Sequence, residues 1–334
     1  MDSCIIMTAE ISAVGAYVPE RRVSNEDLAQ TVDTSDEWIR SHSGIGYRHI
    51  ASDDEASSDL GVKAARTALE RAGVAAEEID MIICSTASPD YPGFPATASL
   101  IEEKLGAQNA GAFDILAGCT GFVYGLELAR GLIFSGAYRN VLVVAAEELS
   151  KITNWQDRST CVLFGDGAGA VVVQGNPHGG DRGILNSILR SQGAGAKALI
   201  RPAGGTAYPF KPGETPPEDL LIQMDGRAVY NFAVKANTDI LKQLVLDAGH
   251  TLDDVRYVVP HQANNRIIEA AAKRLGMPFE KFYVNIEEYA NTSTASIPIA
   301  LNEMHEKGML EKGDLILTVG FGAGLTSGGT LIRW

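Results

Sequence analysis

The chain has 334 residues, of which 45% are apolar and 21% are charged, and its formal net charge is −14. This length gives room for about two domains with a sizeable core, while the acidic balance argues against a general nucleic-acid-binding surface. No stretch approaches the ~20 apolar residues of a membrane span and the N-terminus has no basic, apolar leader, so we expect a cytoplasmic α/β protein.

Short runs rich in Val and Ile alternate with longer amphipathic stretches along the chain. Such runs are typical of strands that are buried on both faces of a sheet. The first helix between them is expected at 59–73, where apolar residues share one face and Gly73 supplies a stop. The alternation predicts helices packed on both sides of a sheet. The expected strands are 81–84, 140–144, 170–173, 256–259 and 315–319.

Two segments repeat in the same order in each half of the chain. Residues 62–83 resemble residues 234–259, and the second copy is four residues longer, about one helical turn. A Gly-rich segment follows in each half, at 165–169 and 320–324, and we interpret the first as a hairpin turn. Generic α/β units can resemble one another by chance, but two repeats in one order favour duplication. We predict halves at 1–174 and 175–334.

The region between the halves has an unusual composition. Residues 192–219 contain five Gly and five Pro, which favours irregular structure over helix or strand. Loops of this length are often functional lids or disordered segments. The sequence does not indicate which of the two applies.

Four cysteines are too few and too scattered for a disulfide framework, and no metal-ligand spacing of Cys and His occurs. Cys84 and Cys161 lie in or beside apolar strands and are predicted to be core residues, and Cys4 belongs to the terminus. Cys119 lies between a predicted strand at 112–116 and a following helix. A helix N-terminus favours a thiolate, so Cys119 is the candidate nucleophile, although a free cysteine is commonly just buried.

A nucleophilic cysteine needs partners, and His261 has the best position among six histidines. It follows the strand 256–259, and ligands of α/β proteins bind beyond the carboxyl ends of strands. Asn291 opens a polar segment, for which a turn or helix cap is the simpler interpretation. The histidines expected to be exposed to solvent are His49, His178, His250 and His305.

Together, Cys119 in Ala-Gly-Cys-Thr-Gly-Phe, His261 in Pro-His-Gln-Ala-Asn and Asn291 in Asn-Thr-Ser resemble the triad of the β-ketoacyl-acyl-carrier-protein synthase III family. Residues 33–39 and 164–170 are also characteristic, and the resemblance covers nearly the whole chain. Membership implies the thiolase fold, in which two similar α/β halves form a five-layered α-β-α-β-α sandwich. It also implies a homodimer.

The resemblance implies a decarboxylative Claisen condensation that starts type II fatty-acid biosynthesis and needs no metal or other cofactor. Cys119 would take the acyl group of an acyl-CoA, and the carbanion formed from malonyl-acyl-carrier protein would attack it. By resemblance, His261 and Asn291 would stabilise the enolate. The backbone amides of Cys119 and of Gly322 or Gly324 would hold the oxyanion at the acyl carbon.

The carrier-binding positions match the family in part. Trp38 and Arg158 match a pair that sandwiches the CoA adenine. Further matches to CoA or pantetheine contacts are Thr34, Gly226 and Asn264. Departures from the family pattern are His42 for Arg, Asn231 for Lys, Ser327 for Trp and Ala290 for Gly. The loss of these cations would weaken CoA binding unless Arg40 or the carrier protein compensates. The sequence therefore leaves open whether the acyl donor is acyl-CoA or acyl-acyl-carrier protein.

An acidic enzyme that binds an acidic carrier protein needs a local basic face. Arg266, Lys273 and Arg274 lie on the helix predicted after His261, where the family's docking helix is basic; an ordinary solvated face is the alternative. Phe94 matches a residue that, in this family, reaches across the dimer to close the partner's acyl pocket. An exposed loop side chain is the alternative for Phe94.

Several other functions share parts of this pattern. A starter-unit condensing enzyme or acyltransferase of secondary metabolism would use the same triad. An acyl-CoA hydrolase would release free acid without forming a carbon–carbon bond. A hydroxymethylglutaryl-CoA synthase would need a general-acid Glu upstream of Cys119, where none is evident, and a non-catalytic subunit would be expected to lack the cysteine. The length and branching of the starter are not indicated.

Overall fold

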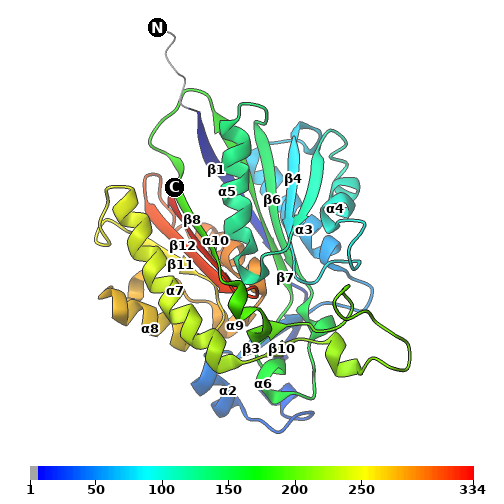
Figure 1. Cartoon of the computed structure of the whole chain (residues 1–334). Helices are drawn as coiled ribbons and strands as arrows, with labels where there is room; N and C mark the ends of the chain where they lie inside the picture. Colours follow the sequence, from blue (N-terminus) through cyan, green and yellow to red (C-terminus); the bar gives the residue numbers. More distant parts are fainter. Residues whose placement is uncertain (1–6) are drawn as a thin grey trace.

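Two sheets form the framework of the molecule, and the computed structural model describes residues 7–334 of the chain (Figure 1). The first sheet has the strand order β1-β7-β6-β4-β5, and the second has the order β11-β12-β13-β8. The strands of the first sheet are β1 Thr8–Tyr17, β4 Met81–Ser85, β5 Gly111–Ile115, β6 Asn140–Glu147 and β7 Gly167–Asn176. Those of the second are β8 Gly183–Ser191, β11 Tyr257–Pro260, β12 Leu315–Gly322 and β13 Thr326–Arg333.

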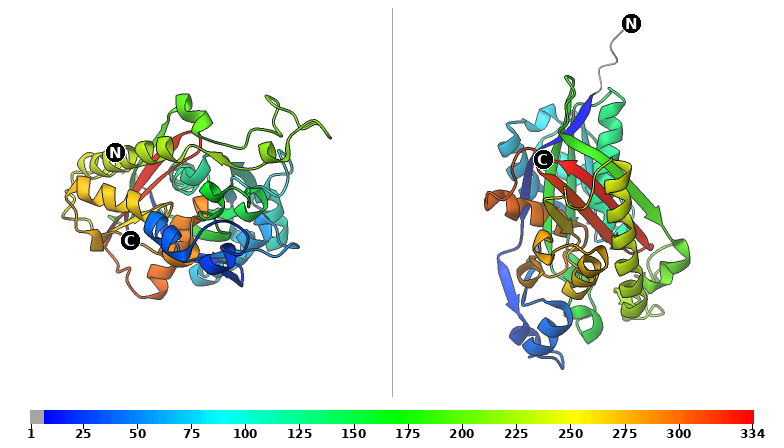
Figure 2. Two further views of the ribbon diagram at one scale, coloured as in Figure 1. Left: turned by 90° about the horizontal axis from the view of Figure 1, so that it is seen from below. Right: turned by 90° about the vertical axis from the view of Figure 1, so that its left-hand side faces the viewer.

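Three pairs of helices complete the layers. The helices α3 (Ser57–Ala72) and α4 (Thr97–Leu105) cover the outer face of the first sheet. Between the sheets lie α5 (Gly121–Phe134) and α10 (Ser296–Glu306), and the outer face of the second sheet is covered by α7 (Gly226–Asp247) and α8 (Asn265–Leu275) (Figures 1 and 2). The predicted α-β-α-β-α sandwich is therefore confirmed.

Short elements gather at one end of the sheets, the lower end in Figure 1. There a two-stranded sheet and two helices form a lobe from residues 21–50, and further short helices follow later in the chain. These elements are β2 Arg21–Ser24, α1 Asn25–Leu28, α2 Asp36–Ser43, β3 Tyr47–Ile50, α6 Arg158–Cys161, β9 Leu199–Ile200, β10 Gln223–Met224 and α9 Ile286–Tyr289.

The helix α5 shows why the centre of the molecule is apolar. It is enclosed by both sheets, so residues on more than one of its faces are buried, including the consecutive Gly121, Phe122 and Val123. Gly125 permits close contact with β6, because a Cβ at Gly125 would lie 2.7 Å from a methyl of Val143. This packing fixes the N-terminus of α5 between the two sheets.

Most of the elements expected from the sequence are present. Each predicted strand is found, and α3 ends at Gly73, which has φ +64°. The hairpin turn predicted at 165–169 is wrong, because Gly167 and Gly169 lie inside β7, which pairs with β1 and β6. The glycines there serve packing, since a Cβ at Gly169 would lie 2.6 Å from Pro298 of α10.

The segment between the halves is largely irregular, as predicted. It contains the 3₁₀ helix Gly193–Ala198 and the short strand β9, which pairs with β10. The division of the chain at 174/175 stays a prediction, and it falls two residues before the end of β7. No helix among residues 7–334 is long and apolar enough to cross a membrane.

Candidate active site

Cys119 lies on the 3₁₀ turn Gly118–Thr120, between β5 and α5. Gly118 has φ +51°, and a Cβ there would lie 2.7 Å from the backbone nitrogen of Ala323, so both conformation and space require glycine. The predicted strand–turn–helix setting is therefore present. The Cys119 side chain is buried, with 8% exposure of the residue.

His261 follows β11, and its ring is held from both sides. Its backbone N–H donates to Val319 O at 2.8 Å, and its ring lies edge-on to Phe321 with centroids 5.2 Å apart. Ring Nδ1 lies 2.7 Å from the Ser296 hydroxyl, which also accepts the Gln262 N–H at 3.2 Å. The Ser296 proton is free to be donated to Nδ1, so we assign the ring hydrogen to Nε2. Burial lowers the pKa of His261 to about 3, so the ring is neutral at neutral pH.

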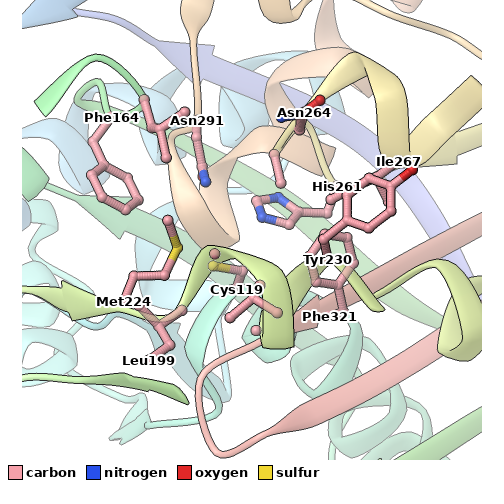
Figure 3. A pocket seen from close by; sticks show the side chains of 15 residues that line it. Cys119, Phe164, Leu199, Met224, Tyr230, His261, Asn264, Ile267, Asn291 and Phe321 are labelled. Atoms are coloured by element: carbon pink, nitrogen blue, oxygen red, sulfur yellow. The ribbon is translucent and has the colours of Figure 1, made fainter. Parts of the chain in front are cut away.

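Asn291 lies after α9, and its amide is oriented by its own turn. Its Oδ1 accepts the backbone N–H of Ser293 at 2.8 Å, so the amide nitrogen is the end that faces the cavity (Figure 3). Its backbone N–H donates to Leu163 O, and its carbonyl accepts the Gly165 N–H. These bonds tie the Asn291 turn to the segment that leads into β7.

Cys119, His261 and Asn291 come from three separate parts of the chain and line one cavity of about 130 Å³ (Figure 3). Most of the other side chains that line it are apolar or aromatic, so a nucleophile there meets little water. These lining residues include Leu199, Met224, Val229, Tyr230, Ile267 and Phe321.

The expected thiolate at the start of α5 is wrong for the resting site. Burial raises the pKa of Cys119 to about 12, and the negative charge of Glu147 acts in the same direction. The nearby Ser293 side chain lowers the pKa of Cys119 but does not offset the effect of burial. Loss of water outweighs the favourable helix N-terminus, so the thiol keeps its proton.

The predicted CoA-contacting residues fall into two groups. Gly226 and Asn264 line the cavity, whereas Trp38 and Arg158 lie together, with the guanidinium 4.8 Å from the indole ring. Asn264 links the groups, because its side chain donates to His42 O at 3.0 Å.

The residues around Trp38 and Arg158 do not form a surface rich in free cations. The His42 ring stacks on Trp38 with centroids 4.4 Å apart. Arg40 pairs with Asp36 at 2.8 Å and with Glu287 at 2.7 Å, so the compensating charge expected of it is already engaged. The hydroxyl of Thr34 is buried without a hydrogen-bond partner, and Asn231 is exposed and neutral.

The remaining candidate residues lie outside the cavity, with one exception. Gly322 lines it, and a Cβ there would lie 2.5 Å from Cys119 N, whereas Gly324 belongs to the β12–β13 turn. Phe94 is 89% exposed and does not reach the cavity of its own chain. The docking candidates Arg266, Lys273 and Arg274 are all exposed on α8 and have no ion-pair partner within residues 7–334.

Other sequence-based expectations are partly right. Cys84 and Cys161 are buried as predicted, while Cys4 lies outside the described residues. His49 is not solvated: it lies in β3, with Nδ1 2.6 Å from Pro19 O and Nε2 3.4 Å from Glu288. His178 and His305 are exposed, and His250 is half-buried. Within residues 7–334 no cluster of three His, Cys, Asp or Glu could hold a metal ion.

The sequence interpretation missed Glu147, Ser293 and Ser296. Glu147 ends β6 and is fully buried, and it accepts hydrogen bonds from Ala87 N–H at 3.0 Å and from the Ser88 hydroxyl at 2.6 Å. A carboxylate directly after a run of buried strand residues was the available signal for Glu147.

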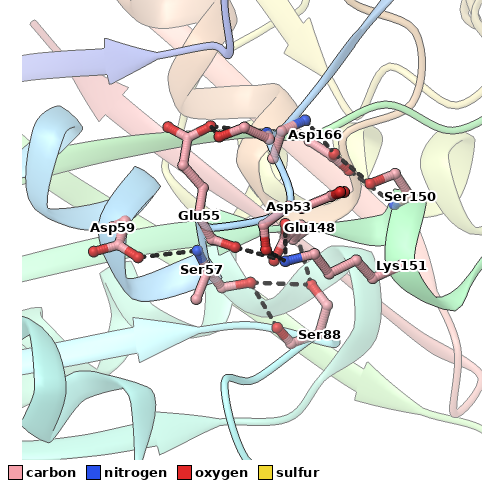
Figure 4. A network of polar contacts seen from close by, with 12 residues as sticks. Asp53, Glu55, Ser57, Asp59, Ser88, Glu148, Ser150, Lys151 and Asp166 are labelled. Carbon is pink, nitrogen blue, oxygen red and sulfur yellow. Dashed lines mark hydrogen bonds and ion pairs between the residues drawn. The ribbon is translucent and has the colours of Figure 1, made fainter.

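Ser88, which donates to Glu147, belongs to a larger polar network (Figure 4). Ser88 accepts the Glu148 N–H at 2.8 Å, and the Ser57 hydroxyl at the start of α3 donates to Ser88 O at 2.6 Å. Lys151 lies 2.8 Å from the Glu148 carboxylate and donates to the carbonyl of Glu55. The network joins the end of β6 to α3 and to the loop after β4.

A cysteine at the buried start of a central helix, facing a neutral histidine and an asparagine between two sheets, defines the thiolase-fold condensing enzymes. The comparisons with known proteins narrow this class. The family model described as 3-oxoacyl-[acyl-carrier-protein (ACP)] synthase III matches residues 113–193, and its C-terminal counterpart matches residues 246–334.

The full-length relatives agree with the family models. The beta-ketoacyl-[acyl-carrier-protein] synthase III of Caldanaerobacter subterraneus subsp. tengcongensis is 50% identical over 332 residues, 99% of each chain. The solved structure of the corresponding synthase of Thermus thermophilus has a TM-score of 0.90 at 44% identity and covers 97% of this chain and 99% of that one. The priming β-ketosynthase of the R1128 polyketide pathway gives 0.89 at 36% identity, covering 97% and 96%. The chain therefore belongs to the β-ketoacyl-acyl-carrier-protein synthase III family.

Proposed function

We propose that this protein is an acyltransferase that condenses an acyl-CoA starter with malonyl-acyl-carrier protein and so initiates type II fatty-acid biosynthesis. The product would be 3-oxoacyl-acyl-carrier protein. The observation that carries the proposal is that a buried thiol, a neutral imidazole and an oriented amide line one largely apolar cavity.

The first half-reaction loads the acyl group. The Cys119 sulfur attacks the thioester carbonyl, the carbon–sulfur bond to CoA breaks, and overall the thiol proton ends on the departing sulfur, which leaves an acyl-enzyme and free CoA. We assign the oxyanion of the tetrahedral intermediate to the backbone amides of Cys119 and Gly322. Gly324 is the weaker candidate, because it does not line the cavity.

The second half-reaction forms the carbon–carbon bond in a ping-pong sequence. As malonyl-acyl-carrier protein loses CO₂, its thioester oxygen gains negative charge and would accept hydrogen bonds from His261 Nε2–H and Asn291 Nδ2–H. A neutral imidazole suits this role, because it donates without being a strong acid. The electron pair for the new bond comes from the bond that releases CO₂, so no redox or metal cofactor is required.

Carrier recognition follows from the surface around the cavity. We infer that CoA binds along Trp38 and Arg158 toward Gly226 and Asn264, with Thr34 nearby. The arginine must then move, because its guanidinium is only 4.8 Å from the indole and an adenine between them needs about twice an aromatic stacking distance.

We further infer that the carrier protein docks on α8 through Arg266, Lys273 and Arg274. Arg266→Glu should slow the use of malonyl-acyl-carrier protein more than tenfold at low salt and change acyl loading from acyl-CoA little, because it opposes only an acidic protein partner. Lys242→Glu, an exposed reversal on α7, is the matched control. Equal losses in both half-reactions would contradict the docking assignment.

The enzyme is inferred to be a cytoplasmic homodimer built from duplicated halves. The strand β5 lies at the edge of the first sheet, and Phe113 and Leu116 at this edge are 37% and 81% exposed. Unpaired apolar edges are normally covered. A partner at this edge would also give Phe94 a pocket to enter.

The proposal is tested with a panel of labelled acyl-CoAs and the intact mass of the enzyme. Acylation should occur on Cys119, disappear in Cys119→Ala, and be followed by 3-oxoacyl product when malonyl-acyl-carrier protein is added. Acylation that is never followed by condensation, or that yields only free acid, would contradict it and favour transfer or hydrolysis.

A starter-unit enzyme of secondary metabolism is the second candidate. The priming β-ketosynthase of the R1128 pathway shares the fold at 36% identity, and His42, Asn231, Ser327 and Ala290 depart from the family pattern. In the same panel, a preference for a starter other than the short acyl-CoAs of fatty-acid initiation would favour this candidate.

A further inference from the structure

Arg48 is a buried arginine that the proposed mechanism does not use. It lies in β3 with 0% exposure, and it forms no ion pair with a carboxylate among residues 7–334. Burial lowers its pKa to about 10, so the guanidinium still carries its charge at neutral pH. A fully buried cation normally has a carboxylate partner, so Arg48 is held in the fold by other groups.

Two hydrogen bonds hold the guanidinium. Nη1 donates to the side-chain oxygen of Asn25 at 2.8 Å, and Nη2 donates to the carbonyl of Val162 at 2.9 Å. Val162 caps the C-terminal end of α6, where backbone carbonyls lack partners within the helix. The planar guanidinium can bond both acceptors at once. Arg48 therefore joins the lobe of residues 21–50 to the segment 162–165.

The segment 162–165 holds the backbone of Asn291 on both sides. The carbonyl of Leu163 accepts the Asn291 N–H at 2.9 Å, and the Gly165 N–H donates to the Asn291 carbonyl at 3.0 Å. Phe164, which lies between these two residues, forms a parallel bridge with Asn291 and lines the cavity beside it (Figure 3). The position of this segment therefore sets the position of Asn291.

The aliphatic part of Arg48 packs on the same segment. A Cβ at Gly165 would lie 3.2 Å from the Cβ of Arg48 and 3.6 Å from the Cβ of Ala290. Arg48 thus contacts the segment at two places, and one of them lies next to the residue that precedes Asn291. Because the Asn291 amide is already oriented within its own turn, the backbone decides where the amide nitrogen lies in the cavity.

We propose that Arg48 is a positioning residue for condensation, because it holds the segment 162–165 and this segment places the Asn291 amide. The inference rests on the proposed function, in which that amide donates to the malonyl thioester oxygen as CO₂ leaves. The oxygen is most negative in the transition state, so a displaced donor slows this step. Acyl loading is assigned to the backbone amides of Cys119 and Gly322 and does not require Asn291.

Arg71 supplies a matched control for a purely structural role. It donates to a backbone carbonyl, that of Val14 at 2.7 Å, and to an asparagine side chain, that of Asn302 at 2.7 Å. It also pairs with Glu306 at 2.8 Å, and none of these partners belongs to the segment 162–165. Arg71→Met therefore removes the same kinds of hydrogen bond as Arg48→Met but leaves the contacts of Asn291 in place.

The experiment measures acyl loading by intact mass and condensation by product formation in the wild type and in each variant. Arg48→Met should lower the kcat of condensation by about 10²-fold, the cost of a misplacement of about 1 Å, and leave acyl loading within a few-fold. Arg48→Lys keeps the charge but cannot span both acceptors, so its loss should be intermediate. Arg71→Met should lower the melting temperature and keep the wild-type ratio of the two rates.

A structural role alone predicts equal losses in both steps, in proportion to the unfolded fraction seen in thermal unfolding. Equal losses, or a wild-type ratio of the two rates in Arg48→Met, would overturn the proposal. Should Arg48→Met fail to fold, Arg48→Lys decides, because wild-type condensation in that variant would show that the two bonds are not needed.

Amide hydrogen exchange gives a readout that needs no substrate. The N–H groups of Asn291 and Gly165 are bonded to each other's segment, so both should exchange about tenfold faster or more in Arg48→Met and at the wild-type rate in Arg71→Met. Unchanged exchange in Arg48→Met would overturn the proposal. Faster exchange in Arg48→Met, together with a wild-type enzyme that does not condense, would support the hold on Asn291 and count against the proposed function.

Discussion

At the scale of single residues, the site depends on which atoms carry hydrogens. The Ser296 hydroxyl sets the hydrogen of His261 on Nε2, and the Ser293 N–H sets the orientation of the Asn291 amide. Both donors therefore point at one place before any substrate binds. This preorganisation is the feature that stabilises a developing oxyanion.

In the proposed function Cys119 takes the acyl group and His261 stabilises the enolate. This division predicts a specific defect in His261→Ala. Acyl loading should stay within a few-fold of wild type, because His261 is assigned to the enolate of the second half-reaction only. Condensation should fall by about 10²–10³-fold, since one oxyanion donor is lost. Intact-mass acylation and product formation measure the two steps separately. A loss of similar size in acyl loading would show that His261 serves the thiol as well.

The backbone conformation of Ala290 predicts that its replacement by glycine stabilises the fold. It is fully buried with φ +56° and ψ −156°, a region that glycine adopts far more readily. Ala290→Gly should raise the free energy of unfolding by about 1 kcal/mol, the strain relieved less the added chain entropy. Urea unfolding measures the change.

Ala295→Gly is the control for this substitution. Ala295 is equally buried but has φ −73°, so the same change should lower stability there by about 1 kcal/mol or more. A loss of stability at both positions would contradict strain at Ala290.

At the scale of elements, the end of β6 holds a neighbouring loop in place. Glu147 accepts hydrogen bonds from the Ala87 N–H and the Ser88 hydroxyl in the loop after β4, and that loop leads to Phe94. The adjacent Glu148 faces away, toward Lys151. The end of β6 is thus tied to the loop after β4 and, through Ser88 and Ser57, to the start of α3 (Figure 4).

Glu148 predicts a measurable dependence of stability on pH. Burial raises its pKa to about 7 from an ordinary value of 4.5, so the folded state holds this proton more tightly than the unfolded state. Its contribution is complete below pH ~4.5 and is lost as the pH rises through about 7, on the order of 2–3 kcal/mol. Glu148→Gln should therefore reduce the fall in unfolding free energy between pH 5 and pH 8.

The control is Glu103→Gln, which neutralises an exposed carboxylate on α4. Urea unfolding at pH 5 and pH 8 is compared for the three proteins. The surface change should leave the pH dependence as it is in the wild type. An unaltered dependence in Glu148→Gln would mean that the carboxyl is ionised in the fold throughout this range.

Local sequence patterns predict which helices and strands form. The surroundings of individual side chains, in contrast, are decided by contacts between residues that are far apart in the chain. The apolar runs are local signals, and they predict the strands and the position of Cys119 between a strand and a helix. His49 was misjudged because Pro19 and Glu288, which surround it, are remote in sequence. The hairpin at 165–169 was wrong for the same reason, since Pro298 is what requires Gly169. Ser296 and His261 meet across 35 positions, and no spacing rule covers that.

At the scale of the whole molecule, net charge and apolar exposure point to different surfaces. The formal net charge is −14, while Arg266, Lys273 and Arg274 on α8, which have no ion-pair partner in the described part of the chain, offer one place for an acidic partner. The exposed apolar side chains lie elsewhere in the fold, with Phe113 and Leu116 at the β5 edge of the first sheet and Phe94 in the loop between β4 and α4. One surface is therefore suited to a transient carrier and the other to a permanent partner.

The dimer surface gives the last prediction. Leu116→Asp places a charge at the β5 edge, where 81% of the residue is exposed in the single chain. It should leave the fold intact and convert dimer to monomer, because a desolvated, unpaired carboxylate opposes association. Leu246→Asp on α7, 68% exposed, is the control and should stay dimeric. Light scattering measures the mass of each variant. Condensation activity should fall as the dimer is lost, since Phe94 would no longer reach a partner's cavity. A dimeric Leu116→Asp would exclude this edge as the interface.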